Sequence, residues 1–174
     1  MIDEIRTALS PLRGLPLWDA GRAATMLWLT LGGRVHAPTT RDPDRITGDY
    51  AVHLQCPWRI SGRGGIVVGS ADMYVPADPD LPEWEFDPER PGNAVADREL
   101  RGWIDRYAHR PLAVIGIEAD RCGGFSLELS EGFAFEVFPD LSRTDPKYGE
   151  YWRVFQPARE TRHFVMRGTG PRRD

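Results

Sequence analysis

The sequence lacks the features that mark a membrane-spanning or secreted chain. No stretch approaches the roughly 18–20 consecutive apolar residues of a membrane helix, and the opening residues lack the positive and then apolar segments of a secretion signal. Cysteine is scarce, and Cys56 and Cys122 lie far apart without forming a CxxC motif, which favours two buried free thiols over a disulfide. These absences predict a cytoplasmic protein without membrane contact.

The charge pattern of a nucleic-acid-binding protein is also missing. The net charge is −4, and Lys147 is the one lysine among 22 basic residues. No long basic stripe is present, and the small cluster Arg167, Arg172 and Arg173 belongs largely to a tail at about 168–174 that we expect to fray. We therefore expect no nucleic-acid partner.

Metal-binding and phosphate-binding motifs are missing as well. The histidines show no HxH, HxxxH or HExxH spacing; they are His36, His53, His109 and His163. The glycine-rich segments 62–65 and 123–124 match neither GxxxxGK[ST] nor GxGxxG, so we interpret them as turns. The sequence predicts no metal site and no cofactor.

What the chain does contain is enough apolar side chain for one folded domain. Hydrophobic residues make up 41% of the sequence and charged residues 28%, a balance typical of globular proteins rather than disordered ones. With 174 residues the chain can bury a core without disulfide or metal staples. We therefore expect a single domain over residues 1–174.

Short apolar runs bounded by glycine, proline and polar turns predict a sheet-rich fold. In the clearest run, 50–56, Val52 and Leu54 fall on one face and His53 on the other. The run 22–31 fits a strand or a helix by its length, and its stop at Gly32-Gly33 favours a strand. The further candidates are 58–60, 66–68, 112–119, 125–129, 133–138, 151–155 and 163–167. We expect an antiparallel, twisted sheet of about six to eight strands.

One hairpin has a predictable register. The short link Ser130-Glu131-Gly132 supplies a glycine for the left-handed position of such a turn. Large apolar residues occupy the odd positions on both sides of the link, so they should meet across the hairpin and face the core. The expected pairs are Leu129 with Phe133, Leu127 with Phe135, and Phe125 with Val137.

Two segments have helical periodicity. Leu100, Trp103, Ile104 and Tyr107 lie at positions i, i+3, i+4 and i+7, which predicts an amphipathic helix near 97–109. A shorter apolar stripe predicts a helix at the start of the chain, and it consists of Ile2, Ile5 and Leu9. The fold class we expect is α+β, with one main helix packed on one face of the sheet.

An acidic, proline-rich segment at about 76–99 is the most unusual part of the sequence. It carries eight acidic residues against two basic ones, and five prolines argue for an extended loop. Aromatic and acidic residues interleave in its centre, as Glu83, Trp84, Glu85, Phe86 and Asp87. This composition suits a binding surface for a basic protein partner, and it equally suits a solvated loop whose tryptophan covers the sheet.

A second group of polar residues offers an alternative ligand site: His53, Gln55, Arg59 and Asp72. His53 and Cys56 could form a base and nucleophile pair, but their odd spacing directs them to opposite faces of a strand. Arg59 and Arg153 each follow a tryptophan in an apolar stretch and need a partner. For both, the candidates are a carboxylate such as Asp72 or Glu136, or the face of an aromatic ring, and an internal salt bridge is favoured over an anion or ligand site.

Four short motifs stand out along the chain: RAAxMxW at 22–28, HxQCPWRI at 53–60, GSxDxY at 69–74 and EVFPD at 136–140. With these motifs, continued through 151–153 to 163–165, the chain resembles a family of small bacterial proteins without assigned function. The resemblance covers roughly residues 21–168 and implies a single bacterial cytosolic domain. It implies no activity.

Three functions remain open at this point. The first is a non-enzymatic protein-binding protein, of the kind represented by immunity proteins and toxin inhibitors. The second is a small-molecule or nucleotide-sensing module that uses the aromatic and arginine residues. The third is a small enzyme with a site around His53, Arg59 and Asp72, which requires these residues to converge on one pocket.

Overall fold

A computed structural model of the chain describes residues 1–40, 42–145, 149–159 and 161–174. In this part of the chain a single antiparallel sheet has the strand order β11-β10-β9-β3-β2-β1-β6-β7-β8-β4-β5. Its strands are β1 Pro16–Ala23, β2 Met26–His36, β3 Ile46–Leu54, β4 Trp58–Gly62, β5 Gly65–Gly69, β6 Leu112–Ala119, β7 Phe125–Leu129, β8 Phe133–Val137, β9 Glu150–Phe155, β10 Phe164–Arg167 and β11 Gly170–Arg173. The expected α+β class is confirmed, but the expected count of six to eight strands is wrong, because the described residues form eleven.

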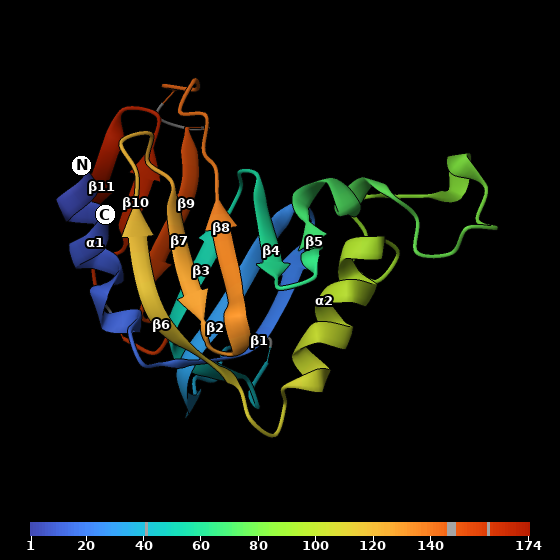
Figure 1. Cartoon of the computed structure of the whole chain (residues 1–174), viewed down its shortest axis with the longest axis horizontal. Coiled ribbons are helices and arrows are strands. Elements are labelled where there is room, and N and C mark those ends of the chain that lie inside the picture. The colour runs from blue at the N-terminus through green and yellow to red at the C-terminus, as the bar shows by residue number, and fades with distance from the viewer. Residues whose placement is uncertain (41, 146–148, 160) are drawn as a thin grey trace.

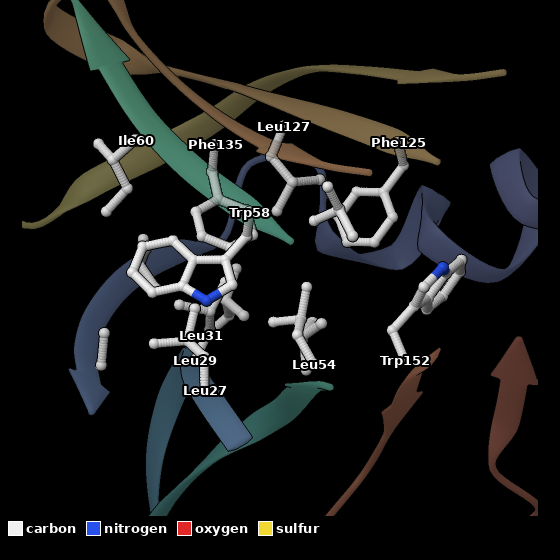
Figure 2. Close-up of a cluster of buried hydrophobic side chains, with 14 of the residues drawn as sticks. Leu27, Leu29, Leu31, Leu54, Trp58, Ile60, Phe125, Leu127, Phe135 and Trp152 are labelled. Atoms are coloured by element: carbon white, nitrogen blue, oxygen red, sulfur yellow. The ribbon is translucent and has the colours of Figure 1, made fainter. Parts of the chain in front are cut away.

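The sheet bends back on itself where β1 meets β6. Two residue pairs join these strands, Pro16 with Ala113 and Leu17 with Leu112. Figure 1 shows β6, β7, β8 and β4 in front of β1, β2 and β3, so that one face of each layer is turned inward. Figure 2 shows the resulting core, in which the leucines of β2 and β3 lie below Trp58 and Phe135. Apolar burial between the two layers therefore holds the fold together.

The hairpin of β7 and β8 has the predicted register. Leu129 pairs with Phe133, Leu127 with Phe135, and Phe125 with Val137. The link η4 (Ser130–Gly132) uses two left-handed residues, Glu131 at φ 63° and Gly132 at φ 80°. The predicted inward face is also confirmed, because Leu127 and Phe135 have no exposed surface.

The run 22–31 differs from its prediction, because it contains a hairpin turn instead of one strand. β1 ends at Ala23 and β2 begins at Met26, and Ala24 occupies the left-handed region at φ 52°. Gly32 and Gly33 do not end β2 but form an irregularity in its pairing with β3, after which β2 continues to His36. The turn between β1 and β2 contains neither glycine nor proline, so the sequence pattern did not predict it.

In the described part of the chain, two α-helices and four short 3-10 segments complete the fold. The helices are α1 (Ile2–Leu9) and α2 (Val95–Arg106), and the other segments are η1 (Ser10–Leu12), η2 (Ser70–Tyr74), η3 (Glu83–Glu85) and η4. α2 contacts β1, β5 and η2, while α1 contacts β6. The predicted stripe on α2 is buried at Leu100, Trp103 and Ile104. The helix begins two residues earlier than predicted, because the Asp97 carboxylate accepts a hydrogen bond from the Ala94 amide.

The tail at 168–174 is ordered, contrary to the expected fraying. Its strand β11 pairs along its whole length with β10. Gly170 at φ 100° allows the tight turn between them, and the Arg167 guanidinium donates a 2.5 Å hydrogen bond to the Asp174 carboxylate. Among the described residues, no helix is both long and apolar enough to cross a membrane.

Candidate functional site

The acidic segment forms an arm that projects from the body of the molecule beyond α2 (Figure 1). We define the acidic arm as residues 78–92. Backbone pairing closes its base: the Ala77 amide donates to the Asn93 carbonyl at 2.7 Å, and the Val95 amide donates to the Val75 carbonyl at 2.8 Å. The chain therefore leaves and re-enters the domain at one place, as in an Ω-loop.

The tip of the acidic arm presents an exposed tryptophan. Trp84 lies in η3 and is 86% exposed. Glu83, Glu85 and Asp87 are exposed around it, while Phe86 is half-buried. Trp84 therefore does not fold back over the sheet. Among the ion pairs of the described residues, none involves these three carboxylates.

Local hydrogen bonds give the acidic arm a defined shape. The Asp78 carboxylate accepts from the Asp80 amide and the Asp87 carboxylate from the Glu89 amide, each at 2.9 Å. These are Asx turns, in which a side chain replaces a backbone acceptor. The Glu85 amide donates to the Pro82 carbonyl at 2.9 Å and closes the turn that carries Trp84.

A buried arginine fastens the acidic arm to the domain. The Arg22 side chain, on β1, is fully buried and donates two hydrogen bonds of 2.6 Å to the Asp97 carboxylate. It also donates to the carbonyls of Pro88, Arg90 and Ala24, and the Arg90 contact measures 3.1 Å. Because two of these carbonyls belong to the acidic arm, Arg22 fixes the returning half of the arm against β1 and α2.

Asp97 completes this anchor as an ionised carboxylate. Burial alone would raise its pKa, but hydrogen bonds from Arg22 and from the amides of Ala94 and Gly92 outweigh burial, and the pKa lies below its usual value. The Gly92 amide donates at 2.8 Å, so the same carboxylate joins Arg22, the end of the acidic arm and the first turn of α2. Arg22 and Asp97 were not among the site residues predicted from the sequence. The one sequence signal for this pair is the charged Arg22 at the start of an apolar run.

The alternative ligand site does not assemble. His53 lies on β3 and lines a groove of about 280 Å³ together with Asp19, Trp28, Thr30, Arg45 and others, and none of these is Gln55, Arg59 or Asp72. Gln55 is exposed just after β3, and Arg59 lies on β4 in the other layer. Asp72 accepts a hydrogen bond from the Gly69 amide at 2.8 Å within η2.

His53 and Cys56 also lack the chemistry of a catalytic pair. Burial raises the pKa of the Cys56 thiol to about 12, so no thiolate forms at neutral pH. Burial, and then the positive charge of Arg153, lower the pKa of His53 to about 4. The His53 ring instead packs edge-on against Phe155, with ring centres 4.8 Å apart.

Both arginines that the sequence singled out have internal partners. Arg59 donates to the Glu136 carboxylate at 2.7 and 2.8 Å, which confirms one of the predicted partners, and its guanidinium lies over the Phe138 ring. Arg153 donates to the Glu150 carboxylate at 2.6 and 2.5 Å and contacts the His163 ring. Neither arginine is therefore held ready for an anionic ligand.

The described residues contain no group of three or more His, Cys, Asp or Glu side chains with the geometry of a metal site. The acidic arm holds an exposed tryptophan that does not pack in the core, so the stability of the fold does not account for it. We therefore take the acidic arm as the candidate functional site. No family model, no curated protein and no solved structure matches this chain.

Proposed function

We propose that this protein is a non-enzymatic, cytoplasmic bacterial protein that binds a basic protein partner through its acidic arm. The observation that carries the proposal is Trp84, which is 86% exposed at the tip of an ordered loop. A large exposed aromatic side chain gains most when a partner buries it, and tryptophan is enriched among interface hot spots. An immunity or inhibitor role fits this mode of binding.

The anchored base of the acidic arm supports this function energetically. Association costs free energy for every flexible segment that becomes ordered in the complex. The hydrogen bonds of Arg22 to the Pro88 and Arg90 carbonyls, and the closed turn at Glu85, are already present in the free protein. Folding has therefore already ordered part of the acidic arm, so binding loses less free energy to ordering it.

The charge of the acidic arm supports a basic partner. Glu83 and Glu85 flank Trp84 directly, and Asp87 and Glu89 follow within five residues. Exposed carboxylates of one sign attract an oppositely charged surface over about one Debye length and raise the association rate. We expect the association rate to fall as ionic strength rises, and the dissociation rate to change less.

The two other functions have weaker support. A ligand-sensing or catalytic site around His53, Arg59 and Asp72 needs these side chains to meet in one cavity. The groove that His53 lines contains neither of the other two, and Arg59 is engaged by Glu136. An enzyme built on these residues would need a rearrangement of the sheet.

Photo-crosslinking from position 89, an exposed position of the acidic arm that leaves Trp84 in place, is carried out in the producing cell. Purification of the captured protein then identifies the partner. Binding is then measured with purified components for Trp84→Ala and for the triple variant Glu83→Gln, Glu85→Gln, Asp87→Asn. We expect the tryptophan variant to weaken affinity at least about thirtyfold and the triple variant to reduce the association rate and its salt dependence.

The matched control removes three exposed carboxylates elsewhere, as Asp42→Asn, Asp44→Asn and Glu118→Gln. It changes the net charge equally but leaves the acidic arm intact. All variants must melt like the unmodified protein. If affinity, association rate and salt dependence stay the same in both arm variants, the acidic arm is a solvated surface and the proposal fails.

A further inference from the structure

A pocket with aromatic walls lies among α1, β3, β9, β10 and the end of β11. Its volume is about 290 Å³. We call it the basic pocket, and its described lining includes Tyr50, Phe155, Phe164, Arg162 and Arg173. Three of these residues are aromatic and two are arginines, whereas none is acidic. The basic pocket is therefore apolar inside and positively charged at its edge.

The two arginines of the basic pocket are available for a partner. Arg162 and Arg173 are exposed, and the ion pairs among the described residues leave both guanidinium groups unengaged. The surrounding sequence is basic as well: residues 143–174 contain eight basic and four acidic residues. The C-terminal segment around the pocket thus has the sign of charge opposite to that of the acidic arm, whereas Asp3 and Glu4 of α1 line a neighbouring pocket together with Arg173.

The basic pocket and the tip of the acidic arm are complementary in two respects. Trp84 is an exposed aromatic side chain, and Tyr50, Phe155 and Phe164 form an aromatic lining. Glu83 and Glu85 stand on either side of Trp84 in the chain, as two arginines stand at the edge of the pocket. Arginine and carboxylate form the strongest charge-assisted pairs.

The acidic arm and the basic pocket lie at opposite ends of the molecule. Figure 1 shows the arm beyond α2 at one end of the long axis, and α1 with β10 and β11 at the other. An arm cannot reach the pocket of its own chain in this arrangement. We propose that the acidic arm of one molecule inserts Trp84 into the basic pocket of a second copy, with Glu83 and Glu85 paired to Arg162 and Arg173.

This inference rests on the proposed function and names the basic pocket of a second copy as one binding site for the acidic arm. The contact joins two different surfaces, so it is heterologous and leaves a free arm and a free pocket at the ends of every dimer. Such a contact adds further copies as concentration rises. A foreign partner that occupies the acidic arm would compete with self-association.

Sedimentation velocity of the full chain tests the inference, at low salt and from about 10 μM to about 1 mM, where contacts of modest affinity become populated. One variant disables the acidic arm, as Trp84→Ser, Glu83→Gln and Glu85→Gln. A second disables the basic pocket, as Arg162→Glu and Arg173→Glu. The control Arg106→Glu, Arg121→Glu makes the same charge change at exposed arginines outside the pocket. Thermal melts confirm that each variant folds.

We expect the unmodified protein and the control to gain mass with concentration, and each disabled variant to weaken self-association at least about thirtyfold. An equimolar mixture of the two disabled variants should then form a one-to-one complex, because each supplies the surface that the other lacks. The inference is overturned if the unmodified protein stays monomeric, if either disabled variant associates normally, or if the mixture forms no complex.

Crosslinking at position 89, with Trp84 in place, separates this inference from the proposed function. Capture of a foreign basic protein by a chain that stays monomeric overturns self-association alone. Loss of both kinds of contact overturns the proposed function as well.

Discussion

At the scale of single residues, the buried Arg22 joins the acidic arm to β1 and α2. Its guanidinium has no exposed surface, and every direction of hydrogen bonding is met by Asp97 or by a backbone carbonyl. A buried charge is costly unless it is paired in this way. Loss of Arg22 would leave two arm carbonyls without this donor, and it would leave the Asp97 carboxylate with the Gly92 and Ala94 amides but without a positive charge beside it.

We therefore predict that Arg22→Met lowers the free energy of unfolding by about 3–5 kcal/mol, as expected when one member of a buried pair is removed. Urea unfolding measures the change. Arg101→Met is the control, because Arg101 is exposed and its ion pair with Asp19 is long, at 3.6 Å, so its loss should cost under about 1 kcal/mol. Equal effects of the two substitutions would contradict the assigned role of Arg22.

A second prediction at this scale concerns the protonation of His53. Its folded-state pKa is lowered to about 4, whereas an unfolded histidine titrates near 6.5. Below pH 6.5 the unfolded chain takes up a proton that the native state does not bind, so His53 makes stability fall as pH drops toward 4. His53→Gln should remove this contribution.

The proton signals of the His53 ring, followed by NMR between pH 3 and pH 8, measure the native pKa directly. We expect a midpoint near 4 in the folded protein. A midpoint above about 6 would show that His53 is solvated like a free histidine. His36→Gln provides the control for stability, since His36 is exposed.

At the scale of elements, the β7–β8 hairpin is the part of the sheet whose sequence determines its register most directly. Phe135 has no exposed surface and stacks on Trp58, with ring centres 6.1 Å apart. Phe135→Ala should therefore cost about 3–5 kcal/mol in urea unfolding, through lost burial and the cavity that remains. Ile66→Ala, at a residue 60% exposed on the edge strand β5, is the control and should cost far less. A loss under about 1 kcal/mol for Phe135→Ala would contradict the assigned core position.

Elements with periodic or glycine-marked sequences were predictable, and elements without such marks were not. The stripe of α2 and the link at Gly132 each combine a pattern with a turn residue, and both predictions are confirmed. β1 was missed because Ala24 makes its turn without glycine or proline. β11 was missed because its short, charged sequence is ordered by pairing with β10, which local pattern does not reveal.

The residues at the tip of the candidate site could be predicted from the sequence, but the contacts that hold the acidic arm in place could not. The interleaved acidic and aromatic residues identified the tip around Trp84 from the sequence. The anchor at Arg22 joins residues 75 positions apart, so only the fold brings it to Asp97. In the same way, the polar residues His53 and Arg59 lie six positions apart in the sequence but occupy different layers of the sheet.

The exposure of the acidic arm leads to a spectroscopic prediction. Trp84 is far more exposed than the other tryptophans, of which Trp58, Trp103 and Trp152 are buried. Trp84→Phe should remove the emission that acrylamide quenches most readily, and it should change the free energy of unfolding by less than about 0.5 kcal/mol. Stern–Volmer titrations of both proteins measure this. An unchanged quenching curve would mean that Trp84 is covered in solution.

At the scale of the whole molecule, apolar burial alone should sustain the fold. The core runs continuously from Ile5 of α1 through Leu29 of β2 and Phe135 of β8 to Met166 of β10, so each layer contributes to one cluster. Both cysteines are free thiols. Cys56 is buried as predicted, whereas the prediction that Cys122 is also buried is wrong, because Cys122 is exposed. A chain of this length can reach ordinary stability from such a core without covalent or metal staples.

We predict that thermal melts with and without EDTA, and with and without dithiothreitol, superimpose. A chelator can destabilise only a protein that binds a metal in its folded state, and a reductant only one that a disulfide constrains. A fall in Tm of more than about 5 °C with either reagent would contradict the prediction, since a shift of that size in a domain like this corresponds to more than about 1 kcal/mol. Cys122→Ser is the control, because oxidation of the exposed thiol could link two molecules and raise an apparent mass that reductant removes. If the melts of this variant also superimpose, the buried apolar cluster is sufficient to hold both layers of the sheet together.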